Sequence, residues 1–75
     1  MKLPSVEQFA TRLHGALLLS RRIAGFASLK TADGDELMVR YEQLPERAKE
    51  LFRDEARGWL RIFEAQDDAG HNGDL

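Results

Sequence analysis

The chain has no cysteine, only two prolines and only two histidines among its 75 residues. Without cysteine it forms neither a disulfide nor a zinc site with thiolate ligands, and His14 and His71 lie far apart in the sequence. We therefore expect no metal and no cofactor. A domain of this size buries only ~60–65% of the surface that its unfolded chain exposes, which predicts self-association as a source of further burial.

Long hydrophobic runs and recognisable catalytic motifs are missing as well. The longest apolar run is Ala16–Leu19, far short of the ~20 residues that span a membrane. Pro4, Glu7 and Arg12 interrupt any pattern resembling a signal peptide. The sequence contains no glycine-rich phosphate loop and no nucleophile motif. It thus predicts a cytoplasmic protein that is not an enzyme and does not bind a membrane.

The charges divide unevenly along the chain. Residues 1–32 carry five cations and one anion, whereas residues 33–75 carry six cations and twelve anions. Such halves attract each other within a monomer or between copies, although a small protein can also scatter its charges unevenly by chance. The net charge of −2 does not favour a nucleic-acid partner, because nucleic-acid-binding proteins usually carry an unneutralised basic excess.

Two amphipathic helices are predicted. The first begins with a capping box at Ser5 and Gln8 and covers about Val6–Ala24, with Gly25 as the glycine that ends it; continuation to Leu29 is the alternative. The second covers Pro45–Ala65 and has proline at its first position. Residues 66–75 are polar and acidic, so we expect a disordered tail after a single domain spanning residues 1–65.

The connector between the helices allows two interpretations. Asp33-Gly34 is a strong turn signal, and apolar residues alternate with polar ones on its C-terminal side. Residues 26–41 therefore form either a β-hairpin or an extended connector. A two-stranded hairpin is marginally stable unless it packs on the helices.

The predicted fold is mainly α: two antiparallel helices joined by this connector and completed by dimerisation. An α+β fold of the form α-β-β-α is the alternative. The apolar residues at helical spacing predict the following core: Phe9, Leu13, Leu17, Ile23, Leu44, Phe52, Trp59 and Phe63.

A basic stripe on the second helix is the clearest candidate binding feature. Its members follow one another at a spacing of four: Lys49, Arg53, Arg57 and Arg61. Such a row could contact phosphates or an acidic protein surface. However, an acid stands three residues before each of the first three cations, at Glu46, Glu50 and Asp54. These pairs favour a neutralised, solvated face.

Four further residues are candidates for binding a partner. Arg21 and Arg22 form a basic edge at the end of the first helix. Tyr41 and Trp59 combine a large contact area with a polar group, which is typical of residues that dominate protein interfaces. Core packing is the alternative role for both aromatic side chains.

The start of the second helix carries a resemblance. The segment Tyr41-Glu42-Gln43-Leu44-Pro45-Glu46 resembles the aromatic-x-x-Leu-Pro-Glu signature of many small phage and prophage proteins. As in those proteins, a basic and aromatic helix follows, here with Lys49, Glu50, Phe52, Arg53 and Ala56. The resemblance implies a phage-type accessory protein in the cytoplasm of a bacterial host. It implies no catalytic residues.

The same stretch is also similar to the short Tyr-x-x-Leu helix of the ryanodine-receptor repeat. The spacing matches at Tyr41, Leu44, Lys49, Glu50, Arg53 and Leu60. Phe52 departs from that pattern, which has an acidic residue before the arginine.

These observations favour a non-enzymatic protein-binding module. Its most concrete form is a phage- or prophage-encoded modulator or inhibitor of a bacterial host protein, such as an inhibitor of host defence. We expect a homodimer and a host protein as partners. The alternatives are a small dimeric nucleic-acid-binding regulator and a structural or assembly component of a phage.

Overall fold

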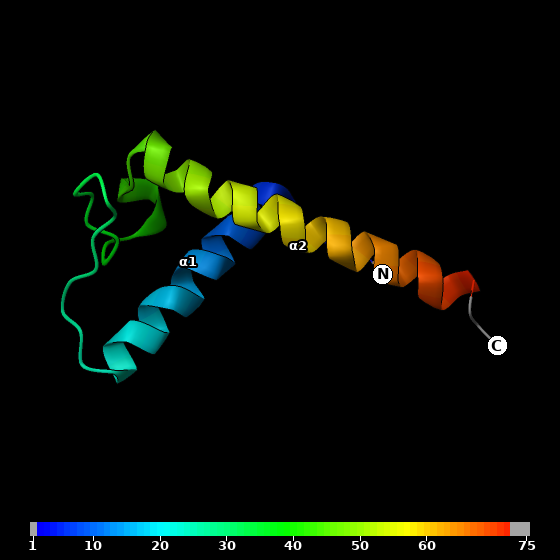
Figure 1. Cartoon of the computed structure of the whole chain (residues 1–75), viewed down its shortest axis with the longest axis horizontal. Helices are drawn as coiled ribbons and strands as arrows, with labels where there is room; N and C mark the ends of the chain where they lie inside the picture. The colour runs from blue at the N-terminus through cyan, green and yellow to red at the C-terminus, as the bar shows by residue number, and fades with distance from the viewer. Residues whose placement is uncertain (1, 73–75) are drawn as a thin grey trace.

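The structure, a computed structural model, describes the backbone of residues 2–72 and the side chains of residues 2–66. It contains helix α1 (Val6–Ile23), the short 3-10 helix η1 (Tyr41–Gln43) and helix α2 (Glu46–Asn72). The two long helices pack against each other near the beginning of α1 and cross at a steep angle, so that they separate toward the end of α1 (Figure 1). No named strand forms in residues 2–72, so the fold is mainly α, as the sequence predicts.

Both ends of α1 are fixed by local hydrogen bonds. The Ser5 hydroxyl oxygen accepts from the Gln8 amide at 3.1 Å, and the Gln8 side chain accepts from the Ser5 amide at 2.9 Å, which confirms the capping box. At the other end, the amide of Gly25 donates to the Arg22 carbonyl and the amide of Phe26 donates to the Arg21 carbonyl. This is a Schellman motif around Gly25, whose φ of 92° favours glycine.

Helix α2 differs from its prediction at both ends. It begins at Glu46, one residue after Pro45, and the Pro45 carbonyl accepts hydrogen bonds from the amides of Ala48 and Lys49. It continues through Asn72 instead of ending near Ala65. The polarity of residues 66–72 suggested disorder, but polarity alone does not end a helix and these residues include no proline. Residues 73–75 of the expected tail lie outside the described part.

The helices approach each other through small residues. Ala10 of α1 and Ala56 of α2 are both completely buried, and Ala48 is 1% exposed. From this region the helices diverge toward the C-terminal end of α1 (Figure 1). Small side chains allow the backbones to come close at one end, while the divergence leaves a wedge-shaped space at the other.

The connector fills that space with apolar side chains. Leu37, Tyr41 and Leu44 are all buried and belong to the same cluster as Ala10 and Ala56. The core is therefore formed by three segments instead of by the two helices alone. It includes no large side chain that is fully buried.

The connector is mostly extended and has one antiparallel bridge, between Lys30 and Glu36. Gly34 takes a φ of 88° in the turn, so the Asp33-Gly34 signal is confirmed although no two-stranded hairpin develops in this segment. The Glu36 carboxylate accepts from the Ser28 hydroxyl, from the Leu29 amide at 2.8 Å and from the Met38 amide at 3.0 Å. These donors lower the pKa of Glu36 from 4.5 to about 2.

The predicted core is partly correct. Leu44 is buried, and the members that are half-buried against the core are Phe9, Leu13, Leu17 and Phe52. Phe63 is half-buried and stacks on Phe9 with ring centroids 5.8 Å apart. The prediction is wrong for Ile23, which is 78% exposed, and for Trp59, which is 42% exposed. Ile23 is the last residue of α1, where the helices have diverged, and Trp59 lies beside the face that packs on α1.

Replacing Ala56 with leucine should lower the free energy of unfolding by about 1–3 kcal/mol, because the added side chain has no room where the helices approach. Urea unfolding followed by circular dichroism measures the change. Ala65→Leu is the matched control, because Ala65 is exposed on the same helix and should change stability by less than about 0.5 kcal/mol. Equal effects of both substitutions would contradict the close approach at Ala56.

Glu36 should make the stability depend on pH. Its pKa is lower in the folded chain than the ordinary value of 4.5, so its contribution is fully present above that pH and is lost as the pH falls toward 2. The difference in urea midpoint between the wild type and Glu36→Gln should be largest at neutral pH and should shrink over this range. Glu64→Gln, at an exposed position, should show a much smaller difference. A difference that does not depend on pH would contradict the assignment.

Candidate protein-binding surfaces

Helix α2 carries a row of exposed apolar side chains. Leu51 is 57% exposed, Ile62 47% and Trp59 42%. Together with Gly58, they lie along one side of the helix, adjacent to the face that packs on α1. We call this set the apolar row. Large apolar side chains exposed in one row are typical of a surface that another protein covers.

A shallow groove of about 280 Å³ lies within the apolar row. It is lined by Asp54, Glu55, Gly58, Trp59 and Ile62. Gly58 has open space where a Cβ atom would stand. The Trp59 indole Nε1 donates to the Glu55 carboxylate at 3.3 Å, which holds the ring along the helix. The groove can therefore receive a side chain from another molecule.

The basic stripe is largely neutralised by acids of the chain itself. The nearest N–O distances are 3.7 Å for Lys49 and Glu46, 3.3 Å for Arg53 and Glu50, and 2.6 Å for Arg57 and Asp54. These three pairs confirm the i,i+3 pairing that the sequence predicts. Arg61, the last member of the stripe, is exposed.

Arg53 connects the two helices. Its guanidinium group donates to both Glu7 carboxylate oxygens, at 2.8 and 3.1 Å, and to Glu46 at 2.8 Å. These contacts lower the pKa of Glu7 and of Glu46. The Arg53 side chain is only 19% exposed. Arg53 therefore already has internal partners, and replacing it would disturb the packing of α1 on α2 as well as any binding.

The two arginines of the basic edge at the end of α1 have different neighbours. The Arg21 guanidinium lies over the Phe26 ring, 6.0 Å from its centroid. Arg22 instead lines a groove that also includes Tyr41. The structure thus places the two neighbouring arginines in different environments.

Tyr41 lies in the core and is only 8% exposed. Burial, followed by the nearby Glu7 carboxylate, raises the pKa of Tyr41. The ring of His14, which is 3% exposed, packs edge-on against Tyr41 and Phe52, and its Nε2 lies 2.9 Å from the Leu37 carbonyl oxygen. Both residues therefore hold the connector against the helices.

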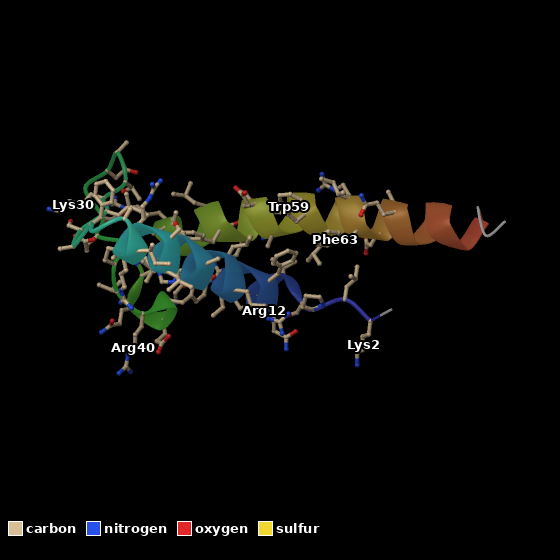
Figure 2. The ribbon with its side chains drawn as sticks, turned by 90° about the horizontal axis from the view of Figure 1, so that it is seen from below. Lys2, Arg12, Lys30, Arg40, Trp59 and Phe63 are labelled. Atoms are coloured by element: carbon tan, nitrogen blue, oxygen red, sulfur yellow. The ribbon has the colours of Figure 1, made fainter. Side chains whose placement is uncertain are left out.

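Three cations that the sequence analysis did not select lie on the same side of the molecule, spaced along its length. Lys2, Arg12 and Arg40 project from one side of the molecule, away from α2 (Figure 2). Within residues 2–66, none of them forms an ion pair. The sequence partly indicated that Arg12 lacks an ion-pair partner on its own helix, because the residues one helical turn from it are all uncharged.

Other kinds of site receive no positive indication. In residues 2–66, no three histidine or acidic side chains cluster as metal ligands would. Neither helix, over the part that the structure describes, is both long and apolar enough to cross a membrane. No family model, curated protein or solved structure matches this chain.

Proposed function

We propose that this chain is a non-enzymatic protein-binding module that acts as a homodimer, encoded by a phage or prophage, and that it modulates or inhibits a bacterial host protein. The observation that carries the protein-binding function is the apolar row of α2. This row leaves three large side chains exposed, while none of the large side chains of residues 2–66 is fully buried. The phage origin and the host cytoplasm as its location rest on the resemblance at residues 41–46.

The spacing of the apolar row suits a second copy of the same helix. Leu51, Glu55, Gly58 and Ile62 follow one another at intervals of four, three and four residues, the spacing of a helix-helix seam. When two such helices pack antiparallel about a two-fold axis, Leu51 faces Ile62 of the second copy and Glu55 faces Gly58. The open space at Gly58 allows the two backbones to approach closely.

The charges beside this seam are complementary in the same arrangement. Asp54 and Arg61 lie on the same flank of the seam, and the two-fold axis brings Asp54 of one copy next to Arg61 of the other. The symmetry forms this pair twice. In a parallel arrangement the two Asp54 side chains would lie on opposite flanks of the seam, and Asp54 would face Trp59 of the other copy instead of Arg61. The charges therefore favour the antiparallel arrangement.

The dimer is tested by Leu51→Asp, which should raise the dimer dissociation constant by at least about tenfold because a carboxylate replaces the apolar contact of Leu51 with Ile62 of the second copy. Analytical ultracentrifugation over a range of concentrations measures it. Leu19→Asp is the control, since Leu19 is 61% exposed on α1 and lies outside the seam.

The charge pair gives a sharper form of this test. Asp54→Arg and Arg61→Asp should each weaken the dimer, and the double variant should recover part of the loss because the pair is restored with its signs exchanged. A wild-type chain that stays monomeric at every concentration would overturn the dimer. Equal weakening by Leu19→Asp would place the contact elsewhere.

Modulation of a host protein is tested with the tagged chain in nuclease-treated bacterial lysate, with the tag alone as control. We expect one host protein at a stoichiometric amount, identified by mass spectrometry, whose own activity changes when the purified chain is added. Recovery of the tagged chain alone, or a captured protein whose activity does not respond, would contradict the proposal.

A further inference from the structure

The side of α1 that faces away from α2 is a surface with several exposed cations. It carries Lys2, Arg12, Arg22 and Arg40, all of them exposed, and Figure 2 shows three of these, Lys2, Arg12 and Arg40, spaced along one side of the molecule. We call this set the cationic face. The ion pairs of residues 2–66 lie instead along α2, between α1 and α2, and between the connector and α2.

Two hollows with apolar linings are each bordered by two cations of the cationic face. The first, of about 360 Å³, is lined by Lys2, Leu3, Pro4, Phe9, Arg12 and Phe63. Its apolar wall includes the stacked rings of Phe9 and Phe63. Its two charged residues, Lys2 and Arg12, are both cations.

The second hollow, of about 520 Å³, lies between α1 and the segment from Met38 to Gln43. Leu18 and Val39 contribute apolar surface, and Arg22 and Arg40 contribute positive charge. Glu42 is the single acidic residue in its lining. Thr11 lines this hollow and Arg12 lines the first; because consecutive residues of a helix point in different directions, the two hollows lie on different sides of α1.

An apolar hollow bordered by cations matches a ligand that presents an apolar side chain between carboxylates. We propose that the cationic face binds an acidic segment of a partner protein, with an apolar side chain of that segment in the hollow at Phe9 and Phe63 and its carboxylates at Lys2 and Arg12. This inference rests on the proposed protein-binding function and assigns that function a surface and a partner chemistry.

The surface suits an acidic protein segment better than a nucleic acid. Proteins that bind duplex DNA commonly neutralise about six to ten phosphates, whereas the cationic face offers four exposed cations and also holds Glu42. The stripe on α2 adds little, since three of its members are paired with acids. Leu3 and Pro4 moreover extend the apolar lining beyond the two phenylalanines.

The test measures binding of the fluorescent peptide Glu-Asp-Glu-Phe-Asp-Glu-Asp to the full chain by anisotropy, at low ionic strength and at about 0.15 M salt, where charges are screened over about 8 Å. The same peptide with serine in place of phenylalanine measures the apolar contribution. A single-stranded and a duplex oligonucleotide of similar charge form the competing arms.

Arg12→Glu should weaken binding of the phenylalanine peptide by about three- to tenfold, because it reverses one charge of an exposed contact. Lys30→Glu is the matched control: it makes the same change at an exposed lysine in the connector, outside the cationic face. The serine peptide should bind more weakly than the phenylalanine peptide, and added salt should weaken both. Circular dichroism confirms that each variant is folded.

Three results would overturn the inference. These are no binding at low ionic strength, equal effects of Arg12→Glu and Lys30→Glu, and tighter binding of an oligonucleotide than of the peptide, which would favour the nucleic-acid alternative. If the peptide fails but a host protein is still captured equally by the wild type and by Arg12→Glu, the cationic face is excluded while the protein-binding function stands.

Discussion

The close approach of α1 and α2 at Ala10 and Ala56 determines how the rest of the chain can pack. Two helices that meet through alanine at one end and diverge at the other cannot form a core by themselves. The connector has to supply Leu37, Tyr41 and Leu44, and the buried ring of His14 contacts both Tyr41 and the Leu37 carbonyl. Arg53 and Glu7 join the helices near their closest approach. Packing and ion pairing therefore act at the same end of the helix pair.

A core of this form leaves part of the apolar surface of the helices exposed to solvent. Alanine side chains bury little area, and the wedge accommodates only part of the apolar residues that the helices carry. Leu51, Trp59 and Ile62 consequently remain exposed on α2, and Ile23 on α1. The same arrangement separates two groups of cations. Most cations on α2 form ion pairs with acidic side chains, whereas in residues 2–66 those on the outer side of α1 form none. The two proposed surfaces thus follow from one packing geometry.

Local features of this fold could be predicted from the sequence, because they depend on residues a few positions apart. The capping box at Ser5, the glycine at Gly25 and the i,i+3 ion pairs of α2 belong to this class. The burial of His14 and the exposure of Ile23 and Trp59 could not, since they depend on where the helices separate. Periodicity identifies the apolar face of a helix but not how much of that face its neighbour covers. The cationic face required the structure, because Lys2, Arg12 and Arg40 come from three separate segments.

The hydrogen bonds of Glu36 bear on the order in which the chain folds. All three of its donors lie within eight positions of it along the chain, so closing the connector requires little loss of chain entropy. The turn can therefore form before the helices meet and shorten the effective distance between them. The pairing of α1 with α2, which joins residues as far apart in the sequence as Glu7 and Arg53, then closes a shorter loop.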